Sequence, residues 1–204
     1  MILDIKKIES KFTKAKQKAN KENKSILFSI TTNSKIELSS IINLNLNKSK
    51  EKIYWSQPSK EFEFIGWSSI FNLDIDNKTV SEISSKIKDI ILNRVQCNIE
   101  NSQSPPIFIG GQNFDINREN KDVWANFPRL NYKIPSVIIL KENISNYITF
   151  NFIVDKNSKK SDIYKSIQNS IDKINNHTLR PNKATSNKFK IDKCKLDNKK
   201  FNDR

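Results

Sequence analysis

The sequence predicts an α+β fold in which a mainly antiparallel β-sheet is flanked by helices. Along the 204 residues, helical patterns and runs of strand-like segments follow one another in the order helix, strands, helix, strands, helix. Two pairs of strands are separated only by short turns, which is typical of antiparallel hairpins. The chain is long enough to bury a core, and no apolar stretch in it is long enough to cross a bilayer.

The first predicted element is a lysine-rich amphipathic helix over residues 2–19. Its apolar face recurs at spacings of three and four and consists of Ile5, Ile8, Phe12, Ala15 and Ala19. A half-buried strand is expected next, because Ile26, Phe28 and Ile30 alternate with other residues.

A β-hairpin is predicted over residues 52–67. The first strand lies near residues 52–55, and a turn containing Pro58 follows. Residues 61–67 alternate charged with aromatic side chains, as expected of the returning strand.

A second helix is predicted over residues 79–96. Thr79 and Glu82 have the spacing of a capping box, in which a hydroxyl and a carboxylate bind the unpaired amides of a helix start. The helix carries one apolar stripe, formed by Val80, Ile83, Ile87, Ile90, Ile91 and Val95.

Strands are expected again after Pro105 and Pro106, with a hairpin turn at Glu142 and Asn143. The segments concerned are 107–109, 130–134, 137–140 and 147–154. A last amphipathic helix begins near Ser161 and has its apolar face at Ile163, Tyr164, Ile167, Ile171 and Ile174.

Only three glycines occur in the chain, and two of them, Gly110 and Gly111, are adjacent. Glycine adopts a positive φ without strain and allows close approach of another segment. The pair therefore predicts a tight turn between two strands over the core.

The chain divides into three regions by composition. Residues 1–25 form a basic N-terminal helix, residues 26–177 form the α+β region, and residues 178–204 have the composition of a basic polar linker. Eight lysines face three acids in the first region, a net charge of +5, and nine basic residues face three acids in the last, a net charge of +6. The middle of the chain carries only +3 of the total +14, as an ordinary domain does.

Two interpretations of this charge are open. Basic ends can contact nucleic acid or another anionic surface. The joint excess of Lys, Asn and Ile is typical of drift toward codons rich in A and T, which is the favoured interpretation. Aromatic residues that could stack on bases, namely Trp55, Trp67, Trp124 and Phe127, lie beside apolar strand residues, so we expect them to be core anchors and do not expect a nucleic-acid partner.

The residues themselves assign no catalytic, cofactor-binding or metal-binding site. The single histidine, His177, lies at the predicted end of a helix, where a cation favours the helix dipole. Asp74 and Asp76 are expected in a solvated turn, and Cys97 and Cys194 lack the spacing of a metal site. Isolated cysteines and the absence of a secretory signal predict a cytoplasmic protein.

Three stretches in order resemble the isochorismate synthases. Residues 53–58, Ile-Tyr-Trp-Ser-Gln-Pro, together with 64–66, Phe-Ile-Gly, are similar to a strand pair of that family, and residues 108–115, Phe-Ile-Gly-Gly-Gln-Asn-Phe-Asp, are similar to its glycine-rich turn. Residues 124–128, Trp-Ala-Asn-Phe-Pro, and the strand 132–140 with Pro135 resemble the segment that follows. The resemblance covers roughly residues 26–155.

The resemblance implies the fold of chorismate-utilising enzymes, including anthranilate synthase, and the conversion of chorismate to isochorismate in quinone or siderophore synthesis. In that chemistry a lysine is the general base, a glutamate is the acid, and carboxylate-held Mg²⁺ binds the substrate carboxylate. The family's catalytic groups lie in a portion beyond the stretches matched here. We therefore expect an N-terminal part that lacks the catalytic portion, binds no Mg²⁺ or chorismate by itself, is inactive alone, and has the catalytic portion as its packing partner.

Two alternatives are retained. A fragment of an anthranilate or aminodeoxychorismate synthase would share the fold. A stand-alone basic protein that contacts nucleic acid would instead show affinity that falls steeply with salt.

Overall fold

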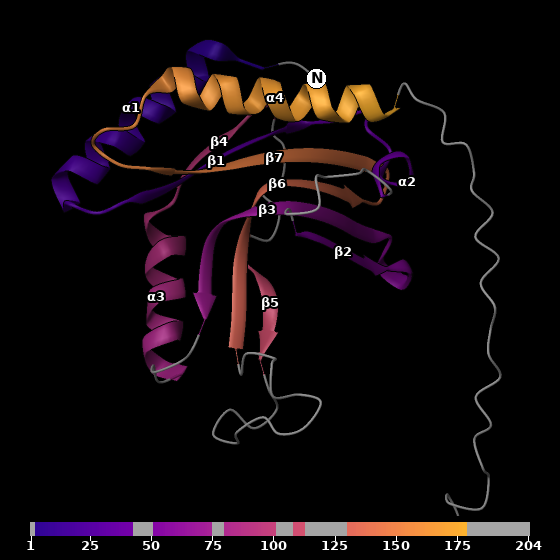
Figure 1. Cartoon of the computed structure of the whole chain (residues 1–204), viewed down its shortest axis with the longest axis horizontal. Coiled ribbons are helices and arrows are strands. Elements are labelled where there is room, and N and C mark those ends of the chain that lie inside the picture. Colours follow the sequence, from indigo (N-terminus) through magenta and orange to yellow (C-terminus); the bar gives the residue numbers. More distant parts are fainter. Residues whose placement is uncertain (1–2, 43–50, 75–79, 101–107, 113–129, 179–204) are drawn as a thin grey trace, which may run out of the picture.

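The computed structural model describes residues 3–42, 51–74, 80–100, 108–112 and 130–178. It contains one sheet in the strand order β2-β3-β6-β7-β1-β4, with β5 paired to β6 outside this path (Figure 1). The elements are, in chain order, α1 (Ile5–Glu22), β1 (Ile26–Asn33), α2 (Leu38–Ile41), β2 (Lys52–Gln57), the 3-10 helix η1 (Pro58–Lys60), β3 (Phe62–Asp74), α3 (Val80–Asn93), β4 (Val95–Asn98), β5 (Ile109–Gln112), β6 (Leu130–Glu142), β7 (Ser145–Val154) and α4 (Lys160–Thr178). All described strand pairs are antiparallel except β1–β4, so the predicted α+β class is confirmed.

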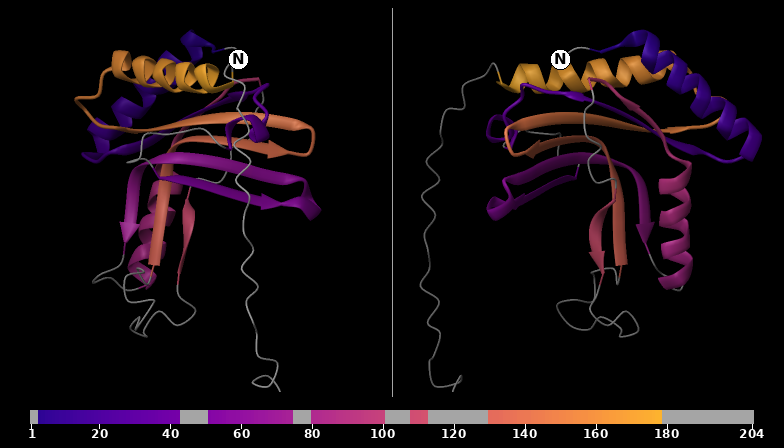
Figure 2. Two further views of the ribbon diagram at one scale, coloured as in Figure 1. Left: turned by 45° about the vertical axis from the view of Figure 1, so that its right-hand side comes forward. Right: turned by 180° about the vertical axis from the view of Figure 1, so that it is seen from behind.

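Helices α1 and α4 lie on the same side of the sheet and cover it with apolar side chains (Figures 1 and 2). Helix α1 starts after Asp4, whose carboxylate accepts a hydrogen bond from the Lys7 amide at 3.0 Å. Four of its five predicted core residues are buried, but Ile5 is 59% exposed, because it lies in the first turn of the helix, at its exposed end. Helix α4 buries Ile163, Ile167 and Ile174 as its spacing predicts.

Strand β1 is buried on both faces, not half-buried as its alternation predicts. All of its residues except Asn33 are buried. Phe28 and Ile30 on one face lie in the main hydrophobic core, and Ser29 and Thr31 on the other face are buried in hydrogen bonds to side chains of β7. The strand lies between β7 on one side and the parallel strand β4 on the other.

Strands β3 and β6 are each 13 residues long and run side by side through a bend. On one side of the bend they pair with β2 and β7. Beyond it they form an arm that β5 extends and that α3 covers with Ile83 (Figure 1). The sequence predicts two separate strands at 130–134 and 137–140, whereas a single strand passes through Pro135.

The helix predicted over 79–96 ends at Asn93, and Val95 opens strand β4 instead of extending the apolar stripe. Val95 is buried against β1, at the register position of Phe28. Val95 is β-branched, and Cys97, two residues later, is also buried, as expected of a short strand. Pairing with β1 therefore selects strand over helix at Val95.

Several predictions lie outside the described residues, and no described helix is long and apolar enough to span a membrane. The predictions concerned are those for Thr79, Asp76, Pro105, Pro106, Trp124, Phe127, Cys194 and the segment 179–204.

Candidate functional site

The bend in β3 and β6 is built around Gly66 and Pro135. A Cβ atom at Gly66 would lie 2.9 Å from Cγ of Pro135, closer than real Cβ atoms approach. Next to this contact, Ser68 has a φ of 54°, and the register of β3 against β6 shifts between Ser69 and Phe71. A bulge increases local twist and bends a strand, so these residues together turn the paired strands into the arm.

Gly110 holds β5 tightly against β6. A Cβ atom there would lie 1.9 Å from the carbonyl oxygen of Asn131, while at Gly111 it would meet nothing within 4 Å. Neither glycine has a positive φ, and both lie within β5. The prediction of a tight turn at this pair is therefore wrong: close backbone approach, not turn geometry, explains Gly110.

The described parts of the stretches on which the resemblance rests lie on neighbouring strands at this bend. Strand β2 pairs with the part of β3 that contains Gly66, and Gly66 contacts Pro135 of β6. Gly110 lies on β6 from its other edge. Segments that are far apart in the chain thus form one continuous part of the sheet (Figure 1).

The sheet face turned away from α1 and α4, called the second face below, has a buried polar row. Side chains alternate along strands, so the neighbours of core residues on β1 and β7 point to this face. The hydroxyl of Ser29 donates to Oδ1 of Asn151 at 2.7 Å, and the hydroxyls of Thr31 and Thr149 lie 2.8 Å apart. All four residues are at most 2% exposed.

Two further contacts extend this polar row. Nδ2 of Asn151 donates to the carbonyl of Pro135 at 2.9 Å, which ties the row to the bend. Asn98, opposite Thr31 on β4, buries its Oδ1 without a hydrogen-bond partner among the described residues. A buried acceptor without a donor is rare in native proteins, which sets Asn98 apart from the paired side chains of the row.

Apolar side chains cover the rest of the second face. Phe64, Ile138 and Leu140 are buried there, while Trp55 lies opposite Phe64 on strand β2 and is 58% exposed. In Figures 1 and 2, α1 and α4 both lie on the other side of the sheet. The expectation that Trp55 is a core anchor is therefore wrong, whereas Trp67 is buried as predicted.

One ion pair lies close to the bend. Nζ of Lys133 is 2.5 Å from Oε2 of Glu51, and the Glu51 carbonyl accepts a hydrogen bond from the amide of Ser68 at 3.1 Å. The hydroxyl of Ser68 is buried and has no partner among the described residues. The adjoining space, about 10 Å³, has room for at most one water molecule.

Ionisable groups elsewhere in the described part of the chain do not converge. No group of three or more His, Cys, Asp and Glu residues there could hold a metal ion. Burial lowers the pKa of Arg94 to about 10 and raises the pKa of the Cys97 thiol, but the first follows α3 and the second is enclosed in the core. His177 is the penultimate residue of α4, as predicted.

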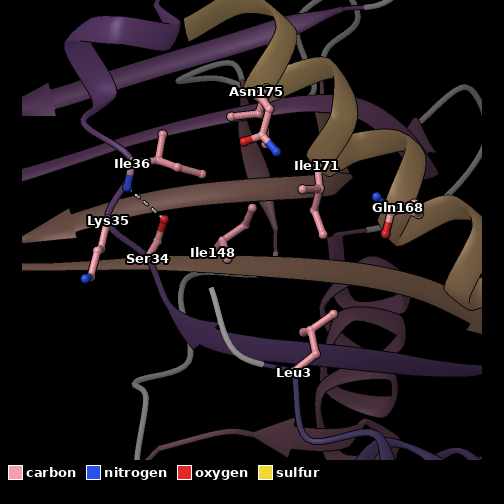
Figure 3. A pocket seen from close by; sticks show the side chains of 9 residues that line it. Leu3, Ser34, Lys35, Ile36, Ile148, Gln168, Ile171 and Asn175 are labelled. Atoms are coloured by element: carbon pink, nitrogen blue, oxygen red, sulfur yellow. Dashed lines mark hydrogen bonds between the residues drawn. The ribbon is translucent and has the colours of Figure 1, made fainter. Parts of the chain in front are cut away.

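A separate cavity of about 520 Å³ lies on the helix side of the sheet, between α4 and the end of β1 (Figure 3). Its apolar lining comes from Leu3, Ile36, Ile148, Ile171 and Ile174. The cavity has no catalytic group, and sequence patterns did not indicate it because its lining comes from four distant segments.

The sequence reasoning missed the polar row altogether. The signal was present: Ser29, Thr31, Thr149 and Asn151 interrupt otherwise apolar strands at every second position. Such a pattern on strands buried on both faces marks a polar face inside the molecule.

Comparison with known protein families gives a match over most of the chain. A family model described as "Chorismate binding enzyme" matches residues 12–204. No curated protein and no solved structure matches the chain.

Proposed function

Because this chain belongs to the family of chorismate-binding enzymes, we propose that it forms the N-terminal scaffold of an isochorismate synthase. The observation that carries the proposal is that the described parts of the three resembling stretches lie on neighbouring strands of one bend, where Gly66 packs against Pro135 and Gly110 packs against the backbone of β6. Sequence similarity alone cannot require these contacts. They support a shared bent-sheet architecture.

In isochorismate formation, water adds to one ring carbon of chorismate while a hydroxyl departs from another. The reaction needs a base for the water, an acid for the departing hydroxyl and a cation for the substrate carboxylate. Mg²⁺ supplies that cation in the resembling enzymes. The described residues do not fit a Mg²⁺ site, so we assign the catalytic and metal-binding groups to the catalytic portion and none to these residues.

The role we propose for this chain is to support that portion through the second face. Trp55, which is 58% exposed on this face, is a side chain that a packed neighbour would cover. Covering it removes apolar surface from water, which favours packing. The polar row, which Asn151 links to the bend, would hold the strands of this face in position when the neighbour binds.

The test is turnover of chorismate by the purified chain in the presence of Mg²⁺, with products separated by chromatography. We expect no isochorismate from the chain alone, and isochorismate when the catalytic portion encoded with it is added. Isochorismate formation by the chain alone would overturn the scaffold role. Anthranilate or aminodeoxychorismate as the product of the reconstituted enzyme would replace isochorismate synthase by one of its relatives.

A second experiment tests the packing role directly. We expect the chain to bind an apolar fluorescent dye, and the catalytic portion to displace that dye. Trp55→Ser should reduce dye binding. The matched change Tyr132→Ser, at a half-buried residue packed against α3, should leave dye binding at the second face unchanged. Absence of dye binding together with normal assembly would contradict the use of this face.

A specific feature favours a second candidate function, which is binding of nucleic acid. Lys7, Lys11, Lys14, Lys18 and Lys21 follow one another at helical spacing, so they share one side of α1. Three of them are exposed, and the apolar face of α1 fixes their position against the sheet. Affinity for single- or double-stranded DNA that falls steeply with salt and is lost on changing these lysines to glutamine would support this function, and negligible binding at low salt would exclude it.

A further inference from the structure

The cavity beside α4 has the size and composition of a ligand site. Its volume of about 520 Å³ lies within the range of roughly 300–1,000 Å³ typical of small-molecule pockets. Ile148 and Ile174 on its floor are at most 1% exposed, while Ile36 and Ile171 at its sides are half-buried. Figure 3 shows Ile148 and Ile171 directed toward each other from the sheet and the helix.

The apolar part of the lining is entirely aliphatic. Leu3 completes it from the N-terminal segment, and no aromatic side chain among the described residues contributes. An aliphatic surface offers dispersion contacts and release of water to an alkyl chain, but no ring face on which an aromatic ligand could stack. The lining therefore favours a flexible aliphatic body over a flat ring.

The rim of the cavity is polar and carries one positive charge. Gln168 and Asn175 come from α4, and Lys35 comes from the segment after β1, on the opposite side. In Figure 3 the amide of Asn175 points toward the cavity, and Lys35 extends outward at the mouth. Glu37 and Asp172 adjoin lining residues in the chain, but neither lines the cavity.

We propose that this cavity binds an aliphatic monocarboxylate. Its alkyl chain lies against the isoleucines, and its carboxylate lies at the mouth beside Lys35 and the two amides. Chorismate does not suit this site, because it carries two carboxylates and a hydroxyl, whereas the lining offers one cation and an apolar floor. The cavity lies on the helix side of the sheet, so the sheet separates it from the second face. The proposal of a monocarboxylate site does not depend on the function proposed above.

The experiment is a calorimetric titration of the full chain with decanoate, kept below its aggregation concentration, and with decanol as the uncharged probe. We expect saturable, one-to-one binding of decanoate and weaker binding of decanol. Gln168→Trp places a large side chain at the exposed rim and should weaken decanoate binding at least tenfold. Lys35→Gln should weaken it about threefold to fivefold, as expected for an exposed ion pair.

Lys165→Gln is the matched control. Lys165 is exposed, as Lys35 is, but it lies on α4 and does not line the cavity. The Lys165→Gln variant should bind decanoate with the affinity of the unchanged chain. Circular dichroism and thermal melting of each variant separate loss of the site from loss of the fold; Ile171→Phe provides a second blocked variant if Gln168→Trp unfolds. Absence of saturable binding, or binding that both blocked variants retain, overturns the proposal.

Discussion

Replacing Gly110 by alanine should separate β5 from β6. The new Cβ would lie 1.9 Å from the carbonyl oxygen of Asn131, and an ordinary contact needs at least 3.4 Å, so one strand must move by roughly 1.5 Å. The neighbouring atom is backbone and cannot rotate away. A shift of that size disrupts pairing along a strand of only four residues.

The expected loss of stability is about 2–3 kcal/mol, from the range measured for overpacked sites and for a few lost backbone hydrogen bonds. In a chain of this length that corresponds to a decrease in Tm of about 4–12 °C. Thermal unfolding followed by circular dichroism measures the decrease, and hydrogen exchange should show faster exchange in β5.

Gly111→Ala is the matched control, since it changes the adjacent residue of the same strand. Its Cβ meets nothing within 4 Å, and its φ is not positive. Reducing the flexibility of the unfolded chain should therefore leave stability unchanged or raise it by up to about 1 kcal/mol. Equal effects of the two substitutions, or unchanged exchange of β5 in Gly110→Ala, would refute the close-approach explanation.

Three further predictions concern burial and ionisation. Trp67→Ala, at a 4% exposed position, should lower the free energy of unfolding by about 3–5 kcal/mol, while Trp55→Ala, at a 58% exposed position, should lower it by under about 1 kcal/mol. Urea unfolding measures both values, and similar losses would contradict the assigned burial. Burial raises the pKa of the Cys97 thiol, so peptide mapping after alkylation at pH 8 should find Cys97 unmodified until urea unfolds the chain, and rapid modification of the folded chain would contradict this. The hydroxyl of Ser158 donates a hydrogen bond to the Asp155 carboxylate and lowers the pKa of Asp155 below its ordinary 3.8. The stabilisation is therefore present above about pH 4 and is lost as the pH falls through the lowered value. The difference in urea midpoint between the unchanged chain and Ser158→Ala should shrink from pH 6 to pH 2, and a constant difference would argue against a hydrogen bond to the ionised carboxylate.

The elements themselves could be predicted from the sequence where periodicity is strong. Ile8, Phe12, Ala15 and Ala19 lie on the buried side of α1 as their spacing indicates. The hairpin turn at Asn143 is also correct, and Asn143 has the positive φ of 53° that asparagine tolerates. These features depend on residues close together in the chain, so local pattern is sufficient.

Predictions were wrong where contacts with a segment distant in the chain determine the local structure. Val95 continues a helical stripe in sequence, yet pairing with β1 places it in a strand. Trp55 and Trp67 have similar apolar neighbours in sequence, yet Trp67 lies in the core on the helix side of the sheet, whereas Trp55 lies on the second face, away from the helices.

The candidate site shows the same division. Motifs around Gly66, Gly110 and Pro135 indicated the family from the sequence, and the family match over residues 12–204 agrees with them. No catalytic residue was assigned, and the polar row was not foreseen. It becomes visible only when β1 and β7 are paired in register.

By itself, then, the sequence determined the α+β class, the two amphipathic helices that cover one face, and the glycine and proline positions that mark the family. Tertiary structure decided why those positions matter: Gly66 and Gly110 are small because Pro135 and Asn131 lie against them, across gaps in sequence that no local pattern spans. Side-chain periodicity records which face of an element is apolar, but sheet order and register decide what that face meets.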